Sequence, residues 1–159
     1  MSTVTLTLEN AIAVITVNNP PINATSHVVR SGIVDALDQI DANDDIRAAI
    51  LICDGKTFIA GADVSEFGQP PKAPILPDVI KRIEAATKPV IAAIHGHALG
   101  GGLEVALGCH YRIADSTAKL GLPEVNLGLI PGAGGTVRLP RLVPVAEAIS
   151  MITSGKPVS

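Results

Sequence analysis

The chain has 159 residues, of which 47% are hydrophobic and 17% are charged, a balance that predicts a folded domain with a core and excludes a disordered tail. Its net charge of −3, with no cluster of lysine and arginine, argues against a nucleic-acid partner. No apolar stretch is long enough to span a membrane, and no export signal stands at the start of the chain. Cys53 and Cys109 are therefore expected to be free thiols in a reducing compartment, and the expected location is cytoplasmic.

The first third of the chain predicts a hairpin, a helix and a buried strand. Apolar residues favour strands over Val4–Leu8 and Ile12–Val17, joined by a short turn. Ser26 is a suitable helix N-cap, and apolar residues then recur at helical spacing up to about Ala42. The continuous apolar run Ala48–Cys53 is typical of a strand that is covered on both faces.

The rest of the chain continues to alternate between strands and helices, without an internal repeat of fixed period. Buried strands that alternate with helices indicate an α/β fold with parallel strand pairing. In chain order, we expect a loop over Asp54–Gly61, an irregular segment over Gln69–Pro77, a helix over Leu76–Ala86, a strand over Val90–Ile94, a glycine turn over Gly96–Gly102, a helix over Leu103–Gly108, strands over Arg112–Asp115 and Lys119–Leu122, a loop over Gly128–Gly135 and a helix over Val145–Thr153.

Three glycine-containing segments suggest nucleotide binding, but their spacing argues against it. Gly55-Lys56-Thr57 resembles the end of a phosphate-binding loop, yet Ile50 stands where that motif needs its first glycine. The segment around Ser154-Gly155-Lys156 fails in the same way. In Gly132-Ala133-Gly134-Gly135 the third glycine of the dinucleotide motif is replaced by Val137, so a dehydrogenase is not predicted from this segment.

The glycine run Gly100–Gly102 leads directly into an apolar helix. Glycine allows close approach to the backbone, and the first amides of a helix have no partner within it. Together these features suit a site that stabilises a developing negative charge on oxygen. The alternative is a tight strand-to-helix turn that simply needs small residues.

Two carboxylates stand among apolar residues. Glu104 follows Leu103 in the apolar helix, where a charge is seldom buried without a partner or a purpose. Glu124 follows Pro123 in a loop. Such a pair could hold a water molecule and divide acid and base roles. The alternatives are a helix-edge carboxylate that reaches water and an ordinary loop acid.

No metal site is expected from the sequence. The spacing of the histidines suits no metal motif, and no His-Glu-x-x-His sequence occurs. All of them are interpreted as structural or rim residues: His27, His95, His97 and His110.

Three segments together resemble the crotonase family of enoyl-CoA hydratases and isomerases. Ile91–Tyr111 resembles the family motif, Gly121–Thr136 its second active-site segment, and Ile59–Val64 the loop that holds the CoA moiety and one oxyanion donor. Further segments resemble the N-terminal part of multifunctional fatty-acid oxidation enzymes, whose NAD-dependent 3-hydroxyacyl-CoA dehydrogenase part has no counterpart here. These segments are Asn19–Ala24, Gly108–Arg112 and Leu139–Leu142.

The resemblance implies a ClpP/crotonase-like fold of repeated ββα units, with one catalytic domain over residues 1–159 whose C-terminal helical part is missing. It implies an enoyl-CoA hydratase that acts on an acyl-CoA thioester and needs neither a metal nor a redox cofactor. The alternatives are a Δ3,Δ2-enoyl-CoA isomerase and a catalytically incompetent fragment or scaffold. The family also implies a trimer-based homo-oligomer for a full-length protein.

The resemblance also implies a role for individual residues. The amides of Ala62 and Gly101 would polarise the thioester carbonyl. Glu104 would activate the water and Glu124 would exchange the proton at C2, while Gly132 would help to position the water. The CoA groove would be lined by Ala60, Gly61, Asp63 and Val64. Ser65 occupies a place where many relatives carry a lysine near the CoA phosphates, and Lys56 or Lys72 is a candidate to compensate.

Overall fold

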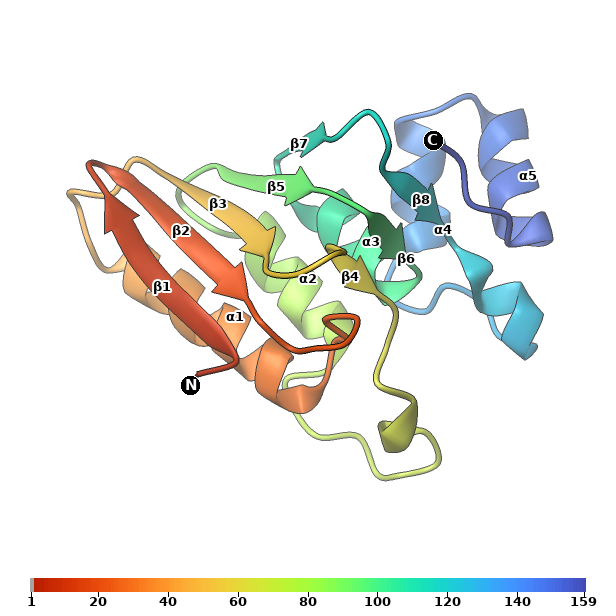
Figure 1. Cartoon of the computed structure of the whole chain (residues 1–159), viewed down its shortest axis with the longest axis horizontal. Helices are drawn as coiled ribbons and strands as arrows, with labels where there is room; N and C mark the ends of the chain where they lie inside the picture. Colours follow the sequence, from red (N-terminus) through yellow and green to blue (C-terminus); the bar gives the residue numbers. More distant parts are fainter. Residues whose placement is uncertain (1) are drawn as a thin grey trace.

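The computed structural model describes residues 2–159 and consists of four successive ββα units followed by one further helix (Figure 1). The expected ββα organisation is therefore confirmed. Short 3-10 turns lie at Val64–Glu66, Pro123–Leu127 and Leu139–Arg141. The units are β1 (Val4–Glu9), β2 (Ile12–Val17) and α1 (His27–Asp41); β3 (Ala48–Cys53), β4 (Ile59–Ala60) and α2 (Leu76–Glu84); β5 (Val90–Ile94), β6 (His97–Leu99) and α3 (Gly101–Gly108); and β7 (Tyr111–Ala114), β8 (Lys119–Gly121) and α4 (Gly135–Arg138), after which α5 spans Val145–Ser154.

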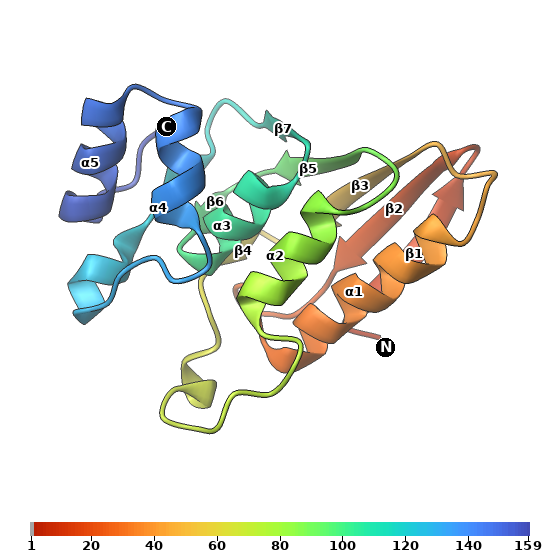
Figure 2. The same ribbon diagram turned by 180° about the vertical axis from the view of Figure 1, so that it is seen from behind.

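The strands form two sheets. The larger sheet has the order β1-β2-β3-β5-β7, in which only the β1–β2 pair is antiparallel. The smaller sheet has the order β4-β6-β8, and all its pairs are parallel. Viewed from behind, α1 and α2 lie over one face of the larger sheet, with α3 beside α2 (Figure 2). Each ββα unit thus contributes one strand to each sheet after the opening hairpin.

Helix α1 shows how the apolar pattern builds this layer. Its N-cap is Ser26, as expected, and the hydroxyl of Ser26 accepts a hydrogen bond from the Val29 amide. Val29, Ile33 and Leu37 then follow at helical spacing and are at most 1% exposed. Complete burial of such a side chain stabilises the fold by about 1.5–3 kcal/mol. The packing of this face on the sheet therefore holds the helix in place.

Two details of the strand prediction were wrong. Strand β3 was expected to be covered on both faces, but only Ala49, Leu51 and Cys53 are buried, and the alternate positions are half-buried. The reason is that the helices cover a single face of the larger sheet (Figure 2). Strands β4 and β6 were missed within predicted loops, because two or three residues are too few to show a period of two.

Helix α3 packs so closely on the smaller sheet that its contact position must be a glycine. A Cβ atom at Gly102 would lie 2.0 Å from the carbonyl oxygen of Ile59 in β4. Every residue of α3 is buried, so the helix cannot move outward without opening the core. The glycines at the start of α3 thus allow close helix–sheet packing, in addition to any chemical role.

We expect Gly102→Ala to lower the free energy of unfolding by about 3 kcal/mol, because the new methyl group meets backbone atoms that cannot turn away. Gly128→Ala is the matched control: Gly128 has a φ of 69°, but a Cβ there meets nothing within 4 Å. The control should lose about 1 kcal/mol from backbone strain alone. Urea denaturation of both variants measures the difference, and equal losses would contradict the packing argument.

Candidate active site

A cavity of about 490 Å³ lies where α3, β4 and the loops around Glu124 and Gly132 meet. Its wall is mostly apolar, and its only carboxylates among the described residues are those of Glu104 and Glu124. A pocket of this size with a few convergent polar groups is typical of a small-molecule site. The cavity collects eight of the nine residues that the sequence singled out: Ala60, Gly61, Ala62, Val64, Gly101, Glu104, Glu124 and Gly132.

Glu104 is held in a fixed orientation inside the protein. Its side chain projects from α3, and the residue is 2% exposed. One carboxylate oxygen, Oε1, accepts hydrogen bonds from the amides of Ala133 and Gly135, each at 2.8 Å. Burial raises the pKa of Glu104 above its ordinary value, while these two amides and the Arg138 charge act in the opposite direction. Glu104 is therefore a buried carboxylate with a backbone cradle.

Glu124 also lines the cavity, and its carboxylate has fewer hydrogen-bond partners than that of Glu104. Its Oε2 atom is buried and has no hydrogen-bond partner within residues 2–159. The carboxylate lies against Gly100, where a Cβ would be 3.3 Å from Oε1. Burial raises the pKa of Glu124, and the negative charge of Glu104 raises it further. The two carboxylates thus lie close enough for the charge of Glu104 to affect the titration of Glu124, although they come from different segments, α3 and the 3-10 turn Pro123–Leu127.

Two backbone amides in the cavity wall are free to donate. Gly101 is the first residue of α3, so its amide has no partner within the helix. Ala62 follows Gly61, whose φ is 111°. Within the part of the chain that the structure describes, neither amide donates a hydrogen bond to protein. Two such donors beside a pair of carboxylates can stabilise an oxyanion.

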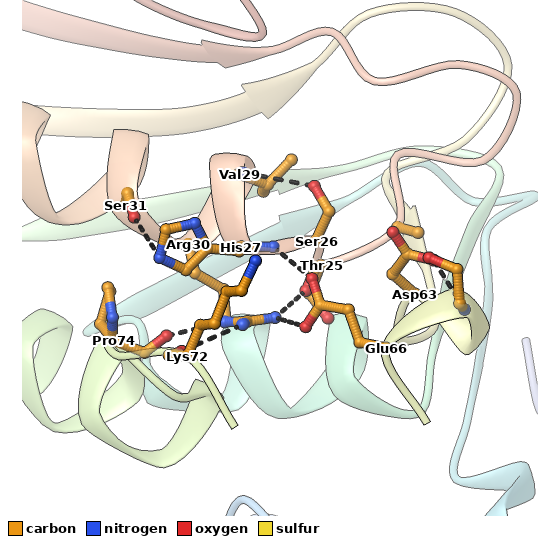
Figure 3. Close-up of polar contacts among 12 residues, drawn as sticks. Thr25, Ser26, His27, Val29, Arg30, Ser31, Asp63, Glu66, Lys72 and Pro74 are labelled. Atoms are coloured by element: carbon orange, nitrogen blue, oxygen red, sulfur yellow. Dashed lines mark hydrogen bonds and ion pairs between the residues drawn. The ribbon is translucent and has the colours of Figure 1, made fainter. Parts of the chain in front are cut away.

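The segment that carries Ala62 is tied to the start of α1 by Arg30 (Figure 3). The Arg30 guanidinium donates to the carbonyls of Thr25 at 2.7 Å and Pro74 at 2.8 Å, and it pairs with Glu66 at 2.8 Å. Glu66 in turn accepts the backbone amide of His27 at 2.6 Å. This network fixes both ends of the segment that follows β4.

Backbone contacts align the same segment with residues 22–25. The Ala60 amide donates to the Ile22 carbonyl at 3.0 Å, and the Thr25 amide donates to the Gly61 carbonyl at 3.1 Å. The Asn23 side chain donates to the carbonyls of Asp54 and Thr57. Sequence reasoning did not assign roles to Asn23, Arg30 or Glu66. The signal that could have found Arg30 is its place beside Val29 on the apolar face of α1, where a charge needs partners.

Asp63 is the one candidate residue that lies outside the cavity. Its carboxylate accepts hydrogen bonds from the amide of Ser65 at 3.0 Å and from the Ser65 hydroxyl at 2.7 Å, which lowers the pKa of Asp63. Asp63 thus caps the 3-10 turn Val64–Glu66, within which Ser65 lies. Ser65, the position at which the family resemblance suggested a lysine, therefore has a local structural contact.

Three of the four histidine side chains contact backbone groups, and no histidine lines the cavity. His110 accepts the Val90 amide at 3.1 Å, and a ring nitrogen of His27 lies 2.8 Å from the Ala73 carbonyl oxygen. Residues 2–159 contain no group of three or more histidine, cysteine or acidic side chains able to hold a metal ion. Nor does this part of the chain contain a helix with the length and hydropathy to cross a bilayer.

The stacked ββα units and the glycine-bounded cavity define a protein of the crotonase fold. A sequence profile of the family described as enoyl-CoA hydratase/isomerase matches residues 7–159, and the chain therefore belongs to that family.

Individual relatives agree with this assignment. A probable enoyl-CoA hydratase from Bacillus subtilis is 46% identical and covers 100% of this chain, which spans 64% of that relative. The human peroxisomal bifunctional enzyme is 50% identical over 94% of this chain, which spans 21% of its length. The crystal structure of enoyl-CoA hydratase from Bacillus anthracis superposes with a TM-score of 0.91 at 36% identity, over 99% of this chain and 64% of that one.

We expect Glu104→Gln to lower the pKa of Glu124, because the substitution removes a neighbouring negative charge that favours protonation of Glu124. The carboxyl carbon resonance of Glu124, followed by NMR during a pH titration, measures the shift. Glu147→Gln, at an exposed position of α5, should leave the titration unchanged. An unaltered Glu124 titration in Glu104→Gln would show that the two groups do not interact.

We expect Arg30→Met to destabilise the protein by roughly 3 kcal/mol, because it leaves the carboxylate of Glu66 and several carbonyls without their donor. Arg47→Met is the control, since Arg47 is exposed. It should change stability by less than about 0.5 kcal/mol. Chemical denaturation compares the two variants, and a neutral Arg30→Met would mean that the network in Figure 3 does not hold the segment.

Proposed function

We propose that the protein is an enoyl-CoA hydratase that adds water across the trans-2 double bond of an enoyl-CoA thioester and produces a 3-hydroxyacyl-CoA in fatty-acid β-oxidation. One observation carries the proposal: Glu104 and Glu124 line one apolar cavity beside the unoccupied amides of Ala62 and Gly101. The names of the relatives from Bacillus subtilis and Bacillus anthracis support it. The relatives that act in peroxisomal or glyoxysomal β-oxidation support the pathway.

The amides act on the thioester group. In the proposed complex the thioester carbonyl accepts hydrogen bonds from Ala62 and Gly101. Addition to C3 moves negative charge onto this oxygen and forms an enolate, so donors that are already in place stabilise the transition state more than the ground state. Since Gly101 begins α3, the positive end of the helix favours the same charge.

The carboxylates divide the proton transfers. Glu104 takes a proton from water as the water oxygen bonds to C3, and Glu124 gives a proton to C2 as the enolate collapses. Burial raises the pKa of both carboxylates, but two amides on Glu104 Oε1 oppose this effect, whereas Glu124 has a buried Oε2 without a partner among residues 2–159 and lies near the Glu104 charge. We therefore assign the base role to Glu104 and the acid role to Glu124. Return of one proton from Glu104 to Glu124 completes the cycle, and Gly132 in the cavity wall positions the water.

The thioester itself supplies the reactive group, so the proposed reaction uses neither a metal nor a redox cofactor. We assign the CoA groove to Ala60, Gly61 and Val64, which line the cavity, with Asp63 shaping the adjoining turn. Isomerisation of a 3-enoyl-CoA is a second candidate activity, because the unpaired Oε2 of Glu124 could carry a single proton between two carbons of the same enolate. Product analysis with a 3-enoyl-CoA separates the two activities.

We also propose that the protein forms a trimer-based homo-oligomer in the cytoplasm. Large apolar side chains are exposed on β7 and on the loop after Glu124, including Ile113 at 68% and Ile130 at 79%, and such surface favours association. The unpaired cysteines, Cys53 and Cys109, suit a reducing compartment. Light scattering at several protein concentrations determines the oligomeric state.

We expect Glu104→Gln and Glu124→Gln each to lower kcat for hydration of a short 2-enoyl-CoA by about 10²–10⁴-fold, since each removes one proton-transfer group. Loss of absorbance of the conjugated thioester follows the reaction. The exposed Glu147→Gln on α5 is the control and should keep the wild-type rate. Unchanged turnover in both active-site variants would refute the assignment.

A further inference from the structure

Arg138 lies behind the wall of the cavity and contacts two different elements. Its Nε and Nη2 atoms donate to the two carboxylate oxygens of Glu84, at the end of α2, each at 2.7 Å. Its Nη1 atom donates to the carbonyl oxygen of Ala133 at 2.9 Å. All three guanidinium nitrogens are thus engaged, and the side chain is only 19% exposed. A bidentate pair of this kind fixes the direction of the third bond.

The hydrogen bond from Arg138 Nη1 reaches the loop whose amides bind Glu104. Ala133 and Gly135 donate their amides to Glu104 Oε1, while the Ala133 carbonyl accepts from Arg138. The loop is therefore clamped between the guanidinium on one side and the catalytic carboxylate on the other. Displacement of the Ala133–Gly134 peptide would misalign both amides with respect to Glu104.

Gly134 shows that the chain makes room for this contact. Its φ is 100°, and a Cβ atom there would lie 2.0 Å from the Arg138 Nη1 atom. Only glycine permits both the backbone conformation and the close guanidinium. Gly135 is similarly restricted from the other side, because a Cβ there would lie 3.1 Å from Glu104 Oε1. Each glycine thus leaves room for one of the two charged groups.

We propose that Arg138, oriented by Glu84, is a positioning residue for the reaction: it holds residues 132–135 so that two amides stay aimed at the Glu104 carboxylate. This inference rests on the proposed hydratase function. It links the end of α2 to the reacting groups through a single side chain. Arg138 itself does not line the cavity, so it acts through Glu104 and makes no contact with substrate.

The positive charge of Arg138 also favours the ionised form of Glu104, in addition to its effect on the loop. It lowers the pKa of Glu104 against the effect of burial. The other charged groups near this carboxylate are Glu124 across the cavity and Glu84, which pairs with Arg138 and has His110 nearby. Loss of Arg138 should therefore raise the pKa of Glu104 and move the acidic limb of the pH–rate profile to higher pH, because the base must be ionised.

The test compares Arg138→Met with Arg82→Met. Arg82 is a suitable control, because it too is an ion-paired arginine, with Asp38 and Asp41 as partners, at a similar 23% exposure but does not contact the loop. NMR of the chain gives two readouts that do not require turnover: the pKa of Glu104, and the pH-dependent amide proton shifts of Ala133 and Gly135. Arg138→Met should raise the pKa of Glu104 and reduce the pH-dependent shifts of the two amide protons. Arg82→Met should change neither quantity.

Kinetics supply the second arm. Arg138→Met should lower kcat for enoyl-CoA hydration by about 10- to 100-fold with KM altered less than about 3-fold, since the substrate contacts remain while the base is displaced. Arg138→Lys keeps the charge without the three-way geometry and should restore the pH profile but not the full kcat. This variant also tests the proposal if Arg138→Met does not fold.

The inference would be overturned if Arg138→Lys kept the wild-type amide shifts and the wild-type kcat. It would also be overturned if the effects of Arg138→Met were no larger than those of Arg82→Met. A wild-type protein that does not hydrate enoyl-CoA would instead refute the proposed function. In that case the NMR readouts still decide whether Arg138 orients Glu104.

Discussion

The burial of the Glu104 carboxylate is the constraint on which the rest of the site depends. A carboxylate that is 2% exposed in a fully buried helix loses most of its hydration, and the protein must replace the lost hydrogen bonds. It does so with two backbone amides from a loop about 30 residues further along the chain. That loop must then be held in place, which explains two neighbouring glycines and an arginine with no free nitrogen.

The opposite wall of the cavity is held by a second set of buried polar groups. Asn23 and Arg30 connect the start of α1 to the segments before and after β4. The amide of Ala62 has no acceptor among the described residues, while the amide of Ala60 and the carbonyl of Gly61 are paired. Ala62 lines a cavity with mostly apolar walls, where electrostatic interactions are strong.

Much of the architecture could be predicted from periodicity and composition. The first hairpin, the cap at Ser26, the strand Ala48–Cys53 and the helices α1 and α2 follow from patterns that lie within a single segment. The short strands β4 and β6 could not be predicted in this way, because their pairing depends on segments far apart in the sequence. The same holds for the half-covered sheet, since no strand carries information about which faces later helices will occupy.

The sequence by itself determined the chemistry that is available: two glutamates in apolar surroundings, glycine runs that permit close backbone approach, and an apolar pattern of alternating strands and helices. Only the tertiary structure decided that Glu104 and Glu124 share a cavity, that Asp63 caps a turn, and that Arg30 and Arg138 hold the two walls. The physical reason is the distance along the chain over which each interaction acts. Caps, turns and amphipathic faces are local, whereas a buried charge finds its partners wherever the fold brings a donor within about 3 Å.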